Sequence, residues 1–159
     1  MSTPGAECLI ELRFPARPDR MVLVRETVRT AARYCGFDEL TTRDIVLAVG
    51  EACQNAILHA YDNRNVGQIV LGILRSADSL VLRVTDYGET VDPSKIKPRN
   101  LQDLRPGGLG THFIQELMDS ADFGPSPDGM GNVLQMTKKT QKTGKTGKTG
   151  KTMKRGMEP

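Results

Sequence analysis

The 159-residue sequence has no tryptophan and only three tyrosines and four phenylalanines, so a core must rest on aliphatic side chains. It has three cysteines, Cys8, Cys35 and Cys53, and no Cys-x-x-Cys pair. This odd number predicts neither a disulfide framework nor a zinc site. No apolar run approaches the roughly 20 residues that a membrane-spanning helix needs. The first residues also lack the basic and apolar segments of a signal peptide. We therefore expect a cytoplasmic protein.

Lysine is scarce over most of the chain and abundant at its end. Residues 138–159 hold eight basic residues and one acid, which leaves 14 basic and 18 acidic residues in 1–137. The end repeats Lys-Thr-Gly and has almost no apolar residues, so it cannot bury enough surface to fold. We predict one folded domain at 1–139 and a basic, disordered tail at 140–159. The tail could attract nucleic acid or an acidic partner only weakly.

The spacing of apolar residues in 1–139 predicts an α+β fold. Alternation with a period of two indicates strands, and recurrence every three or four residues indicates amphipathic helices. The order of these elements predicts a two-layer sandwich, in which helices cover one face of a mixed, mostly antiparallel sheet. In chain order we expect a strand at 7–14, helices at 19–34 and 41–61, strands at 67–75 and 79–86, a helix at 109–118, and strands near 121–124 and 131–138.

A row of polar side chains interrupts the predicted helix at 41–61. This helix is apolar around most of its circumference, which indicates that it is buried. Glu51, Asn55 and His59 break the pattern at positions i, i+4 and i+8 and therefore share one face. A buried carboxylate is costly unless it is paired or faces a ligand. The row alone fits a structural ion-pair network as well as the floor of a polar pocket.

Two later segments place glycine beside a charged residue. Asp86 ends the predicted strand at 79–86, and Gly88 follows it. A carboxylate at a strand end, beside a glycine that permits close backbone approach, suits recognition of a donor on a planar ligand. Arg105 precedes a glycine-rich run at 107–110 that leads into a predicted helix. Such a turn presents backbone N–H groups to an anion such as phosphate. Taken alone, the run also fits an ordinary turn, and Arg105 a solvated surface residue.

Together these segments resemble the sequence boxes of the GHKL ATPases. Residues 51–61 resemble the N-box, 86–88 the G1 box and 107–110 the G2 box, in the family's order and spacing. The resemblance covers about residues 7–139. The run at 107–119 is most similar to the small bacterial anti-sigma factor serine/threonine kinases of the RsbW and SpoIIAB type. Many GHKL relatives carry a second glycine in the G1 box where this chain has threonine, and the anti-sigma branch often lacks that glycine.

The resemblance implies an ATP and Mg²⁺ site and a role for each matched residue. Glu51 matches the general base that takes the proton of a substrate hydroxyl. Asn55 matches the Mg²⁺ ligand, and Asp86 the carboxylate that binds the adenine amino group. For His59 we favour a structural role over a phosphate or metal contact. The other implied ATP-binding residues are Gly88 beside the base, Arg105, Gly107, Gly108, Gly110 and Thr111 around the phosphates, and Thr137 near the adenine.

The resemblance also implies a function. It indicates a serine/threonine protein kinase that phosphorylates an anti-sigma factor antagonist, a STAS domain, and sequesters a sigma factor or similar regulator. The alternative is a non-catalytic, ATP-gated protein-binding module. A detached histidine-kinase catalytic domain is disfavoured because the chain shows no long dimerisation helix pair. A nucleic-acid binder is disfavoured because the sequence shows no aromatic stacking platform. A homodimer is an expectation from family analogy alone.

Overall fold

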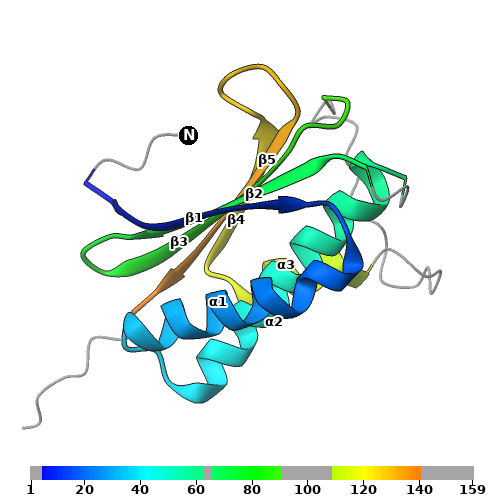
Figure 1. The fold of residues 1–159 in the computed structure, drawn as a ribbon. Coiled ribbons are helices and arrows are strands. Elements are labelled where there is room, and N and C mark those ends of the chain that lie inside the picture. Colours follow the sequence, from blue (N-terminus) through cyan, green and yellow to red (C-terminus); the bar gives the residue numbers. More distant parts are fainter. Residues whose placement is uncertain (1–4, 63–65, 91–108, 141–159) are drawn as a thin grey trace, which may run out of the picture.

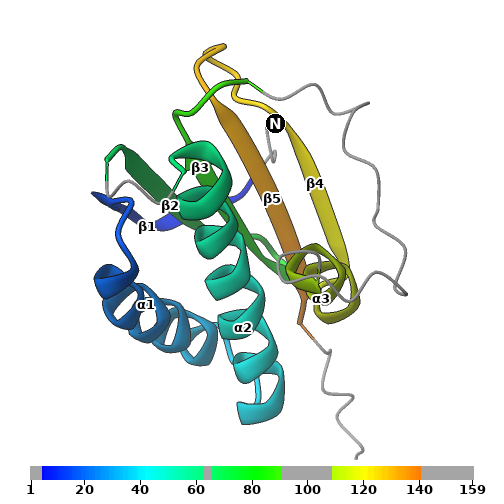
Figure 2. The same ribbon diagram turned by 90° about the vertical axis from the view of Figure 1, so that its right-hand side faces the viewer.

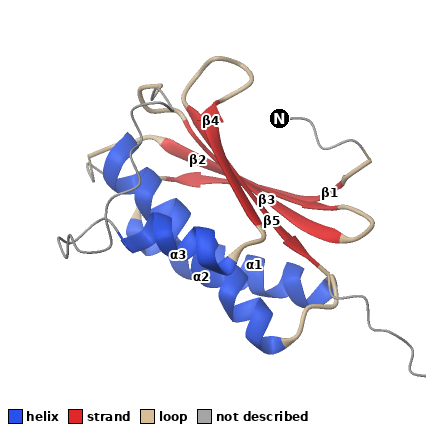
Figure 3. Cartoon of the chain, turned by 180° about the vertical axis from the view of Figure 1, so that it is seen from behind, coloured by secondary structure: helices blue, strands red, loops and turns tan. Residues whose placement is uncertain are grey.

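The computed structural model describes residues 5–62, 66–90 and 109–140. These residues form two layers, with a five-stranded sheet on one side and the helices against one of its faces (Figure 1 and Figure 3). The α+β sandwich expected from the sequence is confirmed. No helix within the described ranges is long and apolar enough to cross a membrane. The basic tail from residue 141 onward lies outside the described residues, so its predicted disorder stays a prediction.

The sheet has the strand order β1-β2-β3-β5-β4. We expected a mixed, mostly antiparallel sheet, and all four pairings among the described residues are antiparallel. Two of these pairings have a local reason, because short turns join β2 to β3 and β4 to β5, and a hairpin can pair its strands only in opposite directions. The strands are β1 (Glu7–Pro15), β2 (Gln68–Arg75), β3 (Ser79–Asp86), β4 (Ser120–Pro125) and β5 (Asn132–Lys139).

In the described part of the chain three α-helices cover the sheet, and α2 lies between α1 and α3 (Figure 2). The second helix begins earlier than the expected Thr41, because Asp38 caps it: Asp38 Oδ1 accepts a hydrogen bond from the Thr41 backbone N–H at 2.7 Å. The predicted helix at 41–61 is also not uniform, since its last turn is π-helical. The elements are a 3₁₀ turn (Pro18–Arg20), α1 (Met21–Tyr34), α2 (Glu39–Asn55), the π-helical turn η2 (Ala56–Ala60) and α3 (Leu109–Leu117).

The hydrophobic core lies between the helices and the inner face of the sheet. Alternate residues of the central strands, such as Leu71 in β2 and Leu82 in β3, are fully buried against α1 and α2. On the helices, Val28 and Ile45 belong to the same core. The apolar row of β3 ends at Asp86, a buried carboxylate on this inner face. The core therefore gives way to a polar site at the end of β3.

Candidate functional site

A cavity of about 530 Å³ opens at this end of the sheet, between η2 and the ends of β3 and β5. This volume falls in the range of 300–1,000 Å³ that is typical of small-molecule sites. Val84, Ile114 and Leu134 give the cavity apolar walls. Several polar groups share the lining, among them Asn55 and Asp86. An apolar slot with a few directed polar groups suits a planar ring that carries a polar tail.

Asp86 is held in the cavity as a hydrogen-bond acceptor. The residue is 7% exposed, and its Oδ1 accepts hydrogen bonds from Asn132 Nδ2 and from the Gly88 backbone N–H, both at 3.0 Å. Burial raises the pKa of Asp86, and the hydrogen bonds from Asn132 and Gly88 act in the opposite direction. The ionised carboxylate, which these donors favour, can only accept hydrogen bonds. It is therefore suited to a ligand that donates one.

Two contacts fix the segment that follows β3. The Tyr61 hydroxyl donates to the Gln68 carbonyl and accepts from the Tyr87 backbone N–H, both at 2.7 Å. Gly88 lies so close to Ala60 that a Cβ at position 88 would come within 2.7 Å of the Ala60 Cβ. A side chain there would meet the backbone of η2, which explains why the position is glycine. The π-helical turn and Tyr61 thus hold the Asp86 end of the cavity in place.

The start of α3 lies against the polar row of α2. A Cβ on Gly110 would come within 2.8 Å of Glu51 Oε2, and within 3.4 and 3.5 Å of Asn55 Nδ2 and Oδ1. Glycine at this position lets the backbone of α3 approach these two side chains without displacing the Glu51 carboxylate. The structure therefore brings together the two segments that the sequence predicted to share a site. Because α3 begins here, its N-terminal turn suits an anion.

The side chains at this junction fit a Mg²⁺–nucleotide but not a free metal ion. Within the described ranges no group of three or more His, Cys, Asp or Glu residues could hold a metal by itself. Glu51 and Asn55 offer carboxylate and amide oxygens, and Mg²⁺ is usually held by one or two protein ligands together with phosphate oxygens and water. The backbone at Gly110 lies close to both side chains. This arrangement fits Asn55 as the metal ligand.

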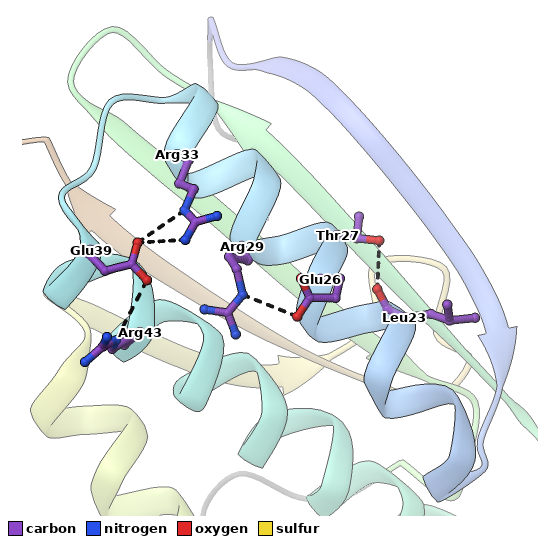
Figure 4. A network of polar contacts seen from close by, with 7 residues as sticks. All are labelled: Leu23, Glu26, Thr27, Arg29, Arg33, Glu39 and Arg43. Carbon is purple, nitrogen blue, oxygen red and sulfur yellow. Dashed lines mark hydrogen bonds and ion pairs between the residues drawn. The ribbon is translucent and has the colours of Figure 1, made fainter.

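Glu51 also lines a second, smaller hollow between α1 and α2, of about 170 Å³. Arg25, Arg29 and Arg43 line the same hollow, which we call the arginine groove. Figure 4 shows two of these arginines in a network with glutamates: Arg29 pairs with Glu26 at 3.3 Å, and Arg43 lies 3.8 Å from a Glu39 carboxylate oxygen. Glu51 thus lies in the arginine groove, one helical turn from the cavity residue Asn55.

The fold and this arrangement agree with one family of known proteins. The family described as the histidine kinase-like ATPase domain matches residues 14–138 of the chain. The chain belongs to this family. This match spans every strand and helix named above except most of β1, of which it includes only the end, and the last residue of β5.

Named relatives in this family cover most of the chain at moderate identity. Each of the following is called serine-protein kinase RsbW. The protein of Oceanobacillus iheyensis is 34% identical over 118 residues, which are 69% of this chain and 75% of the relative. That of Halalkalibacterium halodurans is 34% identical over 137 residues, 81% of this chain and 82% of the relative. One from Staphylococcus aureus is 35% identical over 141 residues, 83% of this chain and 87% of the relative.

Two solved structures share the fold. The structure of the RsbU and RsbW domains of a Mycobacterium tuberculosis protein has a TM-score of 0.57 at 20% identity, covering 81% of this chain and 32% of that one. The SiaB–SiaC complex of Pseudomonas aeruginosa has a TM-score of 0.57 at 17% identity, covering 83% and 90%. At these identities the likeness shows a common fold.

Within the histidine kinase-like ATPase fold, the predicted site residues fall into three groups. Glu51, Asn55, Asp86, Gly88 and Gly110 lie at the cavity or the α2–α3 junction. Thr137 lies on β5 opposite Val81, on the face of the sheet that points away from Asn132 and Leu134, so its position does not support contact with a base in the cavity. Arg105, Gly107, Gly108 and the side chain of Thr111 lie outside the described part of the chain.

Asn132 escaped the sequence analysis, and the place of His59 differs from the expected one. Asn132 pairs with Asp86 across β3 and β5 and donates a hydrogen bond to its carboxylate. The sequence predicted both strands but not their register, and the register is what places Asn132 opposite Asp86. His59, in contrast, was expected to support the structure. The side chain is exposed and lines the cavity, because the π-helical turn carries it there.

Proposed function

We propose that this chain is an ATP-dependent serine/threonine protein kinase whose substrate is the STAS domain of an anti-sigma factor antagonist. The observation that carries the proposal is the junction of Gly110 with Glu51 and Asn55, beside a cavity that contains Asp86. It unites a carboxylate, a metal-binding amide and a helix N-terminus in the way that phosphoryl transfer requires. The names of the RsbW relatives support the same activity.

In this proposal each side chain has one task. Asp86 accepts a hydrogen bond from the amino group of the adenine, in an apolar slot that excludes water. Asn55 holds the Mg²⁺, and the backbone at Gly110 donates to the phosphates. When bound, the metal would neutralise charge on the phosphate oxygens. The protein's own contribution is therefore mainly positioning and electrostatics.

Glu51 accepts the proton of the serine or threonine hydroxyl as the hydroxyl oxygen bonds to the terminal phosphorus. The bond from that phosphorus to the bridging oxygen breaks, and ADP leaves. A general base of this kind typically contributes 10²–10⁴-fold to the rate. The arginine groove gives access to Glu51 from the α1–α2 side, away from the nucleotide cavity. The partner therefore presents its hydroxyl from this side. We extend the proposal to sequestration of a sigma factor or similar regulator in the cytoplasm, as the resemblance implies.

The test is transfer of label from radioactive ATP to a STAS domain encoded beside this protein. Glu51→Gln should lower the rate by about 10²–10⁴-fold while ADP affinity stays close to that of the wild type. Glu39→Gln is the matched control, because Glu39 lies on the same helix, far from Gly110, and pairs with surface arginines. This control should transfer label normally.

Unchanged transfer by Glu51→Gln would reject Glu51 as the base. A wild-type protein that binds ATP and labels no antagonist domain would instead favour the alternative, a non-catalytic module whose affinity for a partner depends on ATP.

A further inference from the structure

Asn132 occupies a defined place beside the Asp86 carboxylate. It is the first residue of β5, it is 2% exposed, and it pairs directly with Asp86 of β3. Gly131 precedes it with a φ of +82°, and a Cβ on Gly131 would overlap the Asp86 carbonyl oxygen. Position 131, just before β5, therefore requires glycine. This tight entry fixes the Asn132 side chain at the cavity.

The Asn132 amide donates in two directions. Its Nδ2 lies 3.0 Å from Asp86 Oδ1 and 3.0 Å from the backbone carbonyl oxygen of Glu89. Both partners are acceptors, so the nitrogen of the amide must face them, and each of its two hydrogens has one partner. The side chain thus ties the end of β3 to the segment that follows it.

The Asp86 carboxylate receives its hydrogen bonds from the start of β5 and from the segment after β3. Asn132 Nδ2 and the Gly88 backbone N–H both donate to Oδ1, and the Asn132 backbone also donates to the carboxylate. Asp86 lines the cavity. Because a carboxylate has about four lone-pair sites, it can accept a further hydrogen bond from a bound molecule.

We propose that Asn132 is the positioning residue that makes the cavity selective for a purine with an amino group at C6 over one with a carbonyl there. By donating to Oδ1 it holds Asp86 as a pure acceptor. The carboxylate then accepts a hydrogen bond from a 6-amino group and repels a 6-carbonyl oxygen. A protonated Asp86 would do the reverse, since its hydroxyl could donate to the carbonyl. The inference rests on the proposed function only in taking the cavity as a purine-nucleotide site.

The electrostatic surroundings support this role for Asn132. Burial raises the pKa of Asp86, and the largest contribution that lowers it is the hydrogen bond from the Asn132 side chain. Removing that donor therefore raises the pKa further and favours protonation as the pH falls. The other titratable groups on this side of the site are His59, Asp62 and Glu89, which line the same cavity, and Tyr61, whose own pKa Asp86 helps to raise. All of these groups remain when Asn132 is replaced, so a comparison of variants measures the effect of the Asn132 amide alone.

The experiment compares ADP with IDP, which differ in the amino or carbonyl group at C6. Calorimetric titration of the full-length wild type, with Mg²⁺, should give affinity for ADP about 10- to 100-fold above that for IDP. This ratio should depend less on pH, between about pH 8 and about pH 6, than the ratio of a variant without the Asn132 amide. In Asn132→Leu, which keeps the size of the side chain without its donors, the ratio should fall by about tenfold or more at about pH 6 and recover toward about pH 8.

Two reference measurements make the result decisive. Asn132→Thr keeps a hydroxyl donor on a β-branched residue that suits a strand, and should restore the ADP-to-IDP ratio. Asp86→Asn carries an amide donor of its own and should shift the ratio toward IDP at both pH values. If Asn132→Leu fails to fold, Asn132→Ala takes its place, and the same fall of the ADP-to-IDP ratio at the lower pH is expected.

The outcomes separate the two proposals. If Asn132→Leu, or Asn132→Ala in its place, loses affinity for ADP and IDP equally at both pH values, Asn132 has only a structural role and the inference is overturned. In that case nucleotide binding, and the proposed function with it, would stand. If the wild type binds neither nucleotide, both proposals are wrong.

Discussion

Gly110→Ala is the substitution that most directly probes the junction of α3 with α2. The added Cβ would lie 2.8 Å from Glu51 Oε2, closer than real Cβ contacts allow, and about at the limit of normal contact with the Asn55 amide. The atom that it meets is the end of a flexible side chain. The Glu51 carboxylate would therefore move, while the backbone of α3 stays in place.

The effects of this substitution on stability nearly cancel. Alanine is favoured over glycine within a helix by up to about 1 kcal/mol. Displacing the Glu51 side chain from its preferred rotamer costs about 0.5–1.5 kcal/mol. The melting temperature should thus change by no more than a few degrees. Catalysis is more sensitive, because a displacement of about 1 Å in a reacting group can lower the rate about 100-fold.

The assay combines a thermal melt, ADP titration and label transfer to the STAS domain. Gly110→Ala should melt near the wild type and transfer label about 100-fold more slowly. Gly72→Ala is the matched control, because a Cβ there meets only ordinary contacts, the nearest at 3.6 Å from Leu74 Cδ1. It lies in β2, away from the cavity, and should keep full activity. Normal transfer by Gly110→Ala would refute the reasoning, since Glu51 could not then depend on the start of α3.

Two further predictions concern the scaffold. Tyr61→Phe removes a hydroxyl that bridges the Gln68 carbonyl and the Tyr87 N–H, and should lower the free energy of unfolding in urea by roughly 1–3 kcal/mol. Tyr34→Phe, at an exposed site, should change it little. Asp38→Ala removes the cap of α2 and should lower the melting temperature at neutral pH, whereas Asp38→Asn should keep most of the stability. The Thr41 backbone N–H lowers the pKa of Asp38, so the difference between Asp38→Ala and wild type should persist above about pH 4 and shrink as pH falls through the lowered pKa. A difference in melting temperature between Asp38→Ala and the wild type that grows as the pH falls would contradict this role of the Asp38 carboxylate.

Local sequence patterns were enough to predict most of the elements. The structure forms strands β2 and β3 where the sequence has a period of two, and helices α1 and α2 where its period is near 3.6. Each pattern is visible in the sequence because it reflects one face that must be buried. The boundaries were less secure. Asp38 starts α2 before Thr41, because a capping side chain fixes the first residue more strongly than the apolar period does.

The sequence by itself determined the family, the polar row on α2 and the glycines that permit close approach, because these are properties of residue type and spacing. Only the tertiary structure placed Gly110 against Glu51 and Asn55, since a contact between helices depends on how they pack. Strand register likewise decided that Asn132 reaches Asp86 while Thr137 points to the other face, because a shift of one residue would exchange the two faces of β5.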